Sequence, residues 1–244
     1  MSFIGPKDVR LEIAKGNVAG SSTVLKFGRN QVVGTSEEDV WDGGGSYAFY
    51  PTTGKALQIR STAAGDTQTV EIQGLSSAYA PQTESVTLSG TGFVALSNKY
   101  NRVFRMKNTG AANNAGSIIC SASGSSEVAA QISVGQNQTL MALYTIPAGV
   151  TGYMTNFFAS VDKNAGGAAS VDINLRVRPA PSSAKVFQSK HRTGLNVAGD
   201  SHVNHIFGTP LKVLEKEDIT LRAEANSGTI DCQAGFDIIL VDNT

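Results

Sequence analysis

The strongest constraint on the fold of this 244-residue chain is a period of two in its apolar side chains. In residues 171–178, Val, Ile, Leu and Val alternate with Asp, Asn and two Arg. Shorter segments repeat the alternation at 56–60, 69–73, 85–89 and 219–224. Alternation places apolar residues on one face of a strand and polar residues on the other, which is typical of antiparallel sheets with one solvated face. The chain is therefore predicted to form antiparallel β-sheets.

Glycine-rich turns separate these segments and leave little room for helices. The sequence contains 26 glycines, and the clusters at 42–45, 64–66 and 89–92 combine Gly with Asp, Ser or Thr. Glycine adopts positive φ angles without steric cost and so permits tight turns between strands. Strands at a spacing of roughly ten residues indicate sandwiches or barrels. The predicted fold class is all-β, with at most a short helix near 214–218.

We predict three parts along the chain. Residues 1–28 contain one amphipathic stretch at 9–13 before Gly20 and two serines, which suggests an N-terminal arm or an added edge strand. Residues 29–128, with short strands and frequent turns, are predicted to form a first β-sandwich-like domain. Residues 129–244, with longer strands and larger loops, are predicted to form a second, jelly-roll-like β domain, a fold of eight strands.

The charge balance argues against a nucleic-acid binder. Lys plus Arg equals Asp plus Glu at 20 each, so the chain has no surplus of cations to neutralise phosphates. Charged residues make up 16% of the sequence, below the ~25% of average soluble domains. A neutral surface provides little repulsion between copies. We therefore expect the chain to work in contact with neighbouring subunits.

The sequence shows no sign of export or membrane insertion. No segment approaches the ~20 apolar residues of a membrane helix, and the first residues lack the basic start and apolar run of a signal peptide. The expected folding compartment is a cytoplasm. Both cysteines, Cys120 and Cys232, lie within apolar runs and are expected to be buried free thiols.

Few residue patterns could support chemistry, and we predict no enzymatic activity, no cofactor and no metal. His202 and His205 have a spacing that resembles that of metal ligands, but on a strand residues three apart face opposite sides. On a loop they could converge with Asp200, although zinc needs three or four ligands. We favour surface histidines and leave metal binding open. No nucleophile motif of the G-x-S-x-G type and no phosphate-binding loop is present.

An acidic segment before a glycine run offers the other chemical candidate. Paired carboxylates can hydrolyse glycosides, and four acidic residues lie close together here: Glu37, Glu38, Asp39 and Asp42. Adjacent acids before a glycine run are more typical of a turn or a loose cation site. We favour that interpretation.

Aromatic residues follow the acidic segment: Trp41, Tyr47, Phe49 and Tyr50. A lone tryptophan is most often a core residue, but tryptophan also concentrates binding energy in protein interfaces. We take these four residues as candidate interface anchors. Alternating aromatics on a strand would also suit sugar binding, although only 7% of the residues are aromatic.

These segments resemble structural proteins of tailed bacteriophages. In residues 30–47, an acidic stretch precedes Val40 and Trp41, a glycine run follows, and a Tyr-x-Phe pattern begins at Tyr47. The sequence continues similarly through short strands to about residue 105. Residues 135–149, an apolar strand that ends in Pro-Ala-Gly, also resemble such proteins.

The resemblance implies a virion component that is made in the bacterial cytoplasm and carries no cofactor. It favours a capsid decoration (cement) subunit, a homotrimer that binds the major capsid protein or another virion protein and stabilises the head. The alternative is a tail, neck or fibre component that binds a host-surface glycan or connects virion parts. Residues 1–28 would suit an arm that adds a strand to a neighbour.

Overall fold

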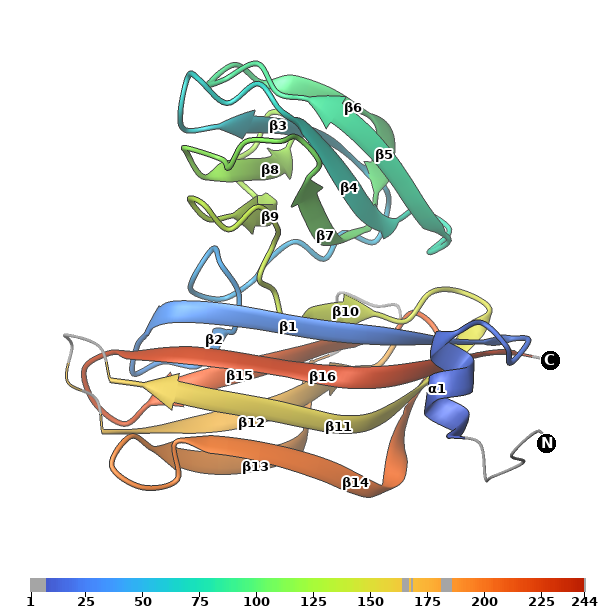
Figure 1. Ribbon diagram of the computed structural model, residues 1–244, viewed down its shortest axis with the longest axis vertical. Helices are drawn as coiled ribbons and strands as arrows, with labels where there is room; N and C mark the ends of the chain where they lie inside the picture. The colour runs from blue at the N-terminus through green and yellow to red at the C-terminus, as the bar shows by residue number, and fades with distance from the viewer. Residues whose placement is uncertain (1–7, 164–166, 168, 181–185, 244) are drawn as a thin grey trace, which may run out of the picture.

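The computed structural model describes residues 8–163, 167, 169–180 and 186–243. Over these residues the chain forms sixteen β-strands and one short α-helix, and all strand pairings are antiparallel. The predicted all-β, sandwich-like fold class is confirmed. Figure 1 shows two stacked bodies, which we call the lower and the upper sandwich.

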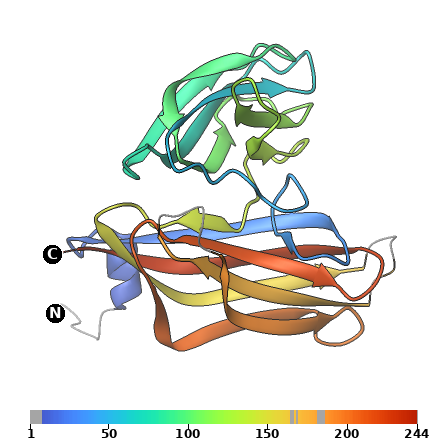
Figure 2. The ribbon, with the colours of Figure 1, turned by 180° about the vertical axis from the view of Figure 1, so that it is seen from behind.

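The lower sandwich consists of two sheets that share one core. The first sheet has the order β1 (Ser21–Val33), β16 (Ile230–Asp242), β11 (Val150–Asp162) and β14 (His202–Val213). The second has the order β10 (Leu143–Thr145), β15 (Asp218–Ala225), β12 (Ser170–Arg178) and β13 (Gln188–Asn196), and β2 (Glu38–Asp39) also pairs with β15. Figure 2 shows the second sheet from its own side. A jelly roll divides eight strands between two sheets, whereas the described residues of the lower sandwich form nine strands with β2, so the jelly-roll assignment stays a prediction.

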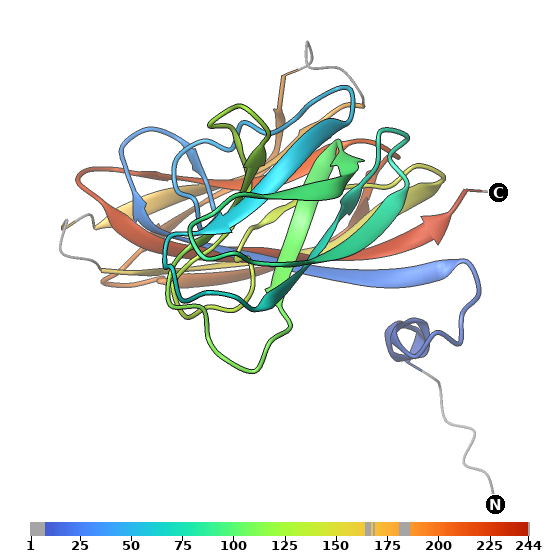
Figure 3. The same cartoon turned by 90° about the horizontal axis from the view of Figure 1, so that it is seen from above.

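The upper sandwich is smaller and also has two sheets. One has the order β6 (Val94–Tyr100), β3 (Lys55–Ser61), β8 (Ile118–Ala122) and β9 (Val128–Ile132). The other has the order β5 (Pro81–Thr87), β4 (Thr69–Leu75) and β7 (Arg102–Asn108). Figure 3 shows this sandwich lying over the lower one.

Each sandwich has its own apolar core, which is built from the predicted alternation. In β12 the four apolar residues of 171–178 all point into the lower core, where Ile173 and Leu175 are fully buried. In β4, Val70 and Ile72 do the same in the upper core. Cys232 lies in the lower core and Cys120 in the upper, and both are free thiols, as predicted.

Hydrogen bonding divides the chain differently from the predicted ranges. β1 spans the end of the predicted arm and the start of the predicted first domain, yet it is an edge strand of the lower sandwich. β9 falls in the predicted second domain but belongs to an upper sheet. The chain leaves the lower sandwich after β2 and returns at β10, so the upper sandwich is an insertion. Residues 1–7 of the predicted arm lie outside the described residues.

The helix prediction needs correction. Residues 214–217 form a turn in which Lys216 has a φ of 63°, and 218 begins β15, so no helix forms there. The helix is α1 (Val9–Ala14), in the segment whose alternation suggested a strand. The Asp8 carboxylate accepts hydrogen bonds from the backbone N–H groups of Arg10 and Leu11 and so caps the helix. This local capping outweighs the short alternating pattern.

Candidate functional site

The two sandwiches meet at a buried carboxylate, Asp218, at the start of β15. Its oxygens accept hydrogen bonds from Arg102 Nε at 2.7 Å and Nη2 at 3.0 Å. They also accept from Arg178 Nε at 3.0 Å and Nη2 at 2.6 Å. The Thr145 hydroxyl donates a further bond at 2.5 Å. Since Arg102 lies on upper strand β7 and Arg178 on lower strand β12, Asp218 connects the two bodies by paired, charge-assisted hydrogen bonds.

Aromatic rings cover the guanidinium groups of this junction. The Tyr50 ring lies 5.0 Å from the Arg102 guanidinium carbon and 4.1 Å from that of Arg178, measured to the ring centroid. Phe187 lies at 4.9 Å from Arg178 and 4.8 Å from Arg222. Cation–π attraction strengthens when the cation is desolvated. The junction is therefore a packed stack of arginine and aromatic side chains rather than an open pocket.

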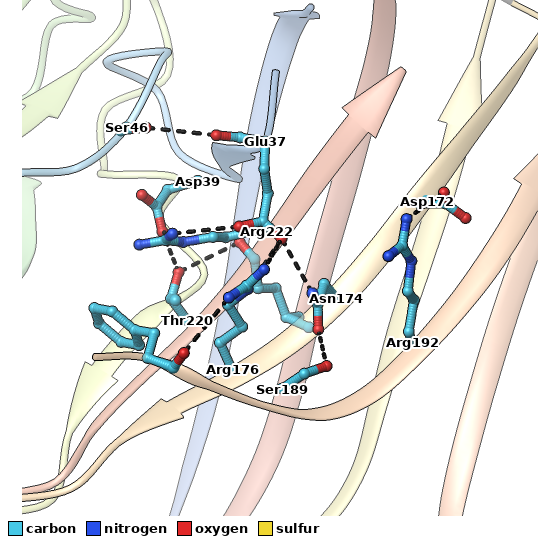
Figure 4. Close-up of polar contacts among 12 residues, drawn as sticks. Glu37, Asp39, Ser46, Asp172, Asn174, Arg176, Ser189, Arg192, Thr220 and Arg222 are labelled. Carbon is cyan, nitrogen blue, oxygen red and sulfur yellow. Dashed lines mark hydrogen bonds and ion pairs between the residues drawn. The ribbon is translucent and has the colours of Figure 1, made fainter. Parts of the chain in front are cut away.

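A second ionic cluster holds the segment around β2, after which the chain crosses to the upper sandwich, against the lower sandwich (Figure 4). Glu37 Oε1 accepts bonds from Arg176 Nη2 at 2.7 Å and Asn174 Nδ2 at 3.0 Å. Asp39 accepts bonds from the Thr220 hydroxyl and from Arg222 Nε. Burial raises the pKa of Asp39, while attraction to Arg222 and these hydrogen bonds oppose the rise. Both carboxylates are thus occupied by cations and hydroxyls of the same chain.

The aromatic interface candidates lie inside the molecule, which corrects that prediction. Trp41, Tyr47 and Phe49 are buried in the upper core, and Tyr50 is half-buried in the junction. The Trp41 and Tyr47 rings pack edge to face with centroids 5.1 Å apart. The Tyr47 hydroxyl donates to the Ala129 carbonyl at 2.8 Å. These rings pack within the chain, and Trp41, Tyr47 and Phe49 leave almost no surface for a partner to contact.

The other acidic candidates shape the glycine loop. Glu38 Oε2 accepts bonds from Asn30 Nδ2 at 2.9 Å and from the Gly45 N–H at 3.1 Å. Asp42 Oδ2 accepts from the backbone N–H groups of Ser133 and Leu140, and burial raises its pKa to about 6. Glu37 and Asp39 are held in ion pairs, and Glu38 and Asp42 by amide donors. Through these hydrogen bonds and ion pairs, the four carboxylates stabilise the glycine loop and the segment around β2.

His202 and His205 do not form a shared metal site, although their spacing would allow one on a loop. His202 is exposed on β14, whereas His205 points inward and stacks on His191 of β13, with ring centroids 4.0 Å apart. Burial and the neighbouring His205 lower the pKa of His191. Within the part of the chain that the structure describes, no three His, Cys, Asp or Glu residues are grouped to hold a metal ion. Sequence reasoning missed His191 because its partner is fourteen residues away on the facing sheet.

The broadest candidate surface is the outer side of the sheet β1–β16–β11–β14, which we call the outer face. The sheet faces the viewer in Figure 1, with α1 in front of one end. Leu25, Asp237, Asn156 and Ile206 lie opposite one another across the four strands, and so do Phe27, Gly235, Phe158 and Asn204. Leu25 is 60% exposed, Phe27 39% and Ile206 64%.

The outer face mixes apolar and polar residues, with Asp237 and Asn156 between Leu25 and Ile206. Gly235 gives Phe158 room, because a Cβ atom there would lie 2.3 Å from the Phe158 ring. Half-buried Tyr153 and Ile239 extend the apolar area along the strands. The exposed apolar residues thus lie on the two edge strands, Leu25 and Phe27 on β1 and Ile206 on β14. Exposed apolar patches on a sheet face mark sites of protein association. Sequence alternation did not reveal it, because the outward positions Leu25 and Phe27 on β1 are apolar too.

Comparisons with known proteins identify no family. No family model matches the chain, and no curated protein matches it. Among solved structures, a protein of Desmodium yellow mottle tymovirus is similar at 12% identity and a TM-score of 0.20, over 38% of this chain and 65% of that chain. The tandem CBM22 domains of Paenibacillus barcinonensis Xyn10C are similar at 10% identity and a TM-score of 0.25, over 78% of this chain and 79% of that chain.

Infectious bursal disease virus VP2 gives 8% identity and a TM-score of 0.21, over 97% of this chain and 82% of that chain. At these values none of the three proteins carries an argument about function. Among the described residues, no helix is both long and apolar enough to cross a membrane.

Proposed function

We propose that this chain is a non-enzymatic structural subunit of a bacteriophage virion, made in the host cytoplasm. Its task is to decorate and stabilise the head by packing against the major capsid protein and against its own copies, as a trimer. The proposal combines the resemblance of residues 30–47 and 135–149 to phage structural proteins with the physical properties of the molecule.

The observation that carries the proposal is the outer face. Leu25, Phe27 and Ile206 leave apolar area in water on the outer side of one four-stranded sheet. Burying apolar surface stabilises an association by about 25 cal/mol per Å². A stable contact of standard size buries ~800 Å² on each partner, which one face of a four-stranded sheet can supply. The occupant we propose is the capsid shell.

The junction supports the same function in a second way. A subunit that reinforces a shell must transmit force between its own bodies, so a fixed relation between them is useful. The bidentate pair of Arg102 with Asp218, and the two hydrogen bonds that Arg178 donates to Asp218 Oδ2, provide that relation without a flexible linker. Low overall charge, at 16% of residues, also favours close packing of many copies.

Charged substitutions on the outer face test the proposal. Leu25→Asp and Ile206→Asp, separately and together, should lower the number of copies that co-sediment with purified heads by at least tenfold for the double variant. Phe93→Asp is the matched control, since Phe93 is 55% exposed but lies in the upper sandwich. Full occupancy by the double variant, with its fold verified by circular dichroism, would contradict the proposal.

A further inference from the structure

A cleft runs between the two sandwiches beside β1 and β7. Its volume is about 510 Å³. Its walls include the aromatic residues Phe104 and Tyr144 and the polar residues Gln73 and Gln138, and β1 borders it where Lys26 lies between the outward-facing Leu25 and Phe27. Two cations, Lys26 and Arg105, complete it, and no carboxylate lines it among the residues that the structure describes.

Lys26 is the unusual member of this cleft. Its side chain enters the space between the sandwiches and is only 8% exposed. Its ammonium donates to the backbone carbonyl of Phe104 and lies 5.9 Å from the centroid of the Phe104 ring. An ammonium has three N–H donors, and a neutral carbonyl offsets little of the cost of burying a full charge.

The neighbouring charges increase this cost rather than relieve it. Burial, followed by repulsion from Arg105, lowers the pKa of Lys26 to about 7. The Glu71 carboxylate, which is attracted to Arg105, is engaged by Lys107 at 2.9 Å. By contrast, the buried guanidinium groups of Arg102 and Arg178 share the Asp218 carboxylate. Lys26 is therefore a deeply buried cation beside a second cation, with space next to both.

We propose that this cleft binds an oxyanion, a carboxylate or a phosphate, between Lys26 and Arg105. The anion would supply a negative charge that no carboxylate of the cleft lining provides, and the Phe104 and Tyr144 rings would pack against an apolar group attached to it. The Arg105 guanidinium donates to Oε1 of Gln138, which also lines the cleft, at 3.0 Å. The guanidinium therefore lies along the wall that Gln138 forms. This inference does not depend on the proposed function.

Binding of an anion has a consequence for protons. Near pH 8 the free protein holds Lys26 mostly as the neutral amine, because its pKa is lowered. A bound anion stabilises the ammonium and raises that pKa, so binding takes up close to one proton at pH 8. Affinity should therefore increase by about tenfold between pH 8 and pH 6. For benzoate, whose carboxylate stays ionised between pH 6 and pH 8, a site without Lys26 would show neither effect.

Titration calorimetry of the full chain with sodium benzoate and with inorganic phosphate tests the proposal, with benzamide as the neutral analogue. Titrations in two buffers of different ionisation enthalpy report how many protons are taken up on binding. We expect saturable binding of either anion with proton uptake at pH 8. Benzamide should not bind. Benzoate alone would identify a carboxylate site, and phosphate alone a phosphate site.

Variants make the result specific to this cleft. Lys26→Met should weaken binding by at least tenfold and abolish proton uptake, while the fold stays as stable as that of the wild type. Arg105→Gln should weaken binding with proton uptake retained. Lys190→Met, at an exposed lysine of β13, is the matched control and should change nothing. Absence of saturable binding of both anions to the wild type, or equal binding by Lys26→Met, would overturn the proposal.

Discussion

At the scale of single residues, the molecule depends on where its buried charges find partners. Asp218 is shared by two guanidinium groups and a hydroxyl, whereas Lys26 has one neutral acceptor. Removing one member of a buried ion network leaves the other charges without compensation, which costs far more than breaking an exposed pair. The junction thus compensates its buried cations with a carboxylate, whereas the lining of the cleft provides none.

The contribution of Asp218 can be measured directly. Asp218→Asn should lower the free energy of unfolding by about 3–5 kcal/mol, because Arg102 and Arg178 would remain buried without a counter-charge. Denaturant unfolding provides the measurement. Asp172→Asn removes an exposed ion pair with Arg192 and should cost no more than about 1 kcal/mol. Similar losses for the two variants would show that the junction does not hold the sandwiches together.

At the scale of elements, close approaches between strands and crossing segments fix how the two sandwiches join. β1 passes beneath the crossing segments where Gly28 lies. A Cβ atom on Gly28 would lie 2.2 Å from the Val40 carbonyl oxygen and 2.3 Å from the Ala142 nitrogen. Both contacts are with backbone, so neither can move aside easily. The glycine is needed for the approach itself, not for a turn.

Gly28→Ala should therefore destabilise the chain by about 1–3 kcal/mol, as overpacking of a dense interior does. Thermal unfolding followed by circular dichroism would detect the change. Gly208→Ala, in β14 with nothing within 4 Å of its Cβ position, is the matched control and should change stability little. A wild-type melting temperature for Gly28→Ala would contradict the close approach of β1 to these segments.

Strands were predictable from the sequence where one face of a strand is polar. The alternation at 171–178 corresponds to β12, and those at 69–73 and 219–224 correspond to β4 and β15. β1 was missed as one long strand because its outward residues Leu25 and Phe27 are apolar while inward Lys26 is charged. At residues 25–27 the usual alternation is therefore reversed, because the apolar side chains face outward and the charged side chain faces inward.

The candidate sites were much less predictable, because they join distant segments. Arg102 and Asp218 are 116 residues apart, and neither lies in a motif. Trp41 and Tyr47 were noticed as a cluster, but composition alone does not tell a core from an interface, and the structure places them in the core. The domain ranges differed for the same reason, since alternation does not say which sheet a strand joins.

At the scale of the whole molecule, one sandwich carries a broad uncovered sheet face and the other stands over it, joined by buried ionic contacts (Figure 1). A shell-binding subunit needs this combination of a docking surface and a rigid body. A glycan-binding tail component would not need an apolar face of this extent, because sugars are bound by exposed aromatic platforms and polar groups. We therefore keep the head as the proposed location.

Quantitative sedimentation of the wild-type chain with separated virion parts tests the central claim most directly. Increasing amounts of purified protein are mixed with heads and with tails, and the copies bound per particle are counted at saturation. The account predicts saturation at hundreds of copies per head and no binding to tails. A protein that stays a folded monomer without binding to heads, or that binds tails in a handful of copies, would contradict it.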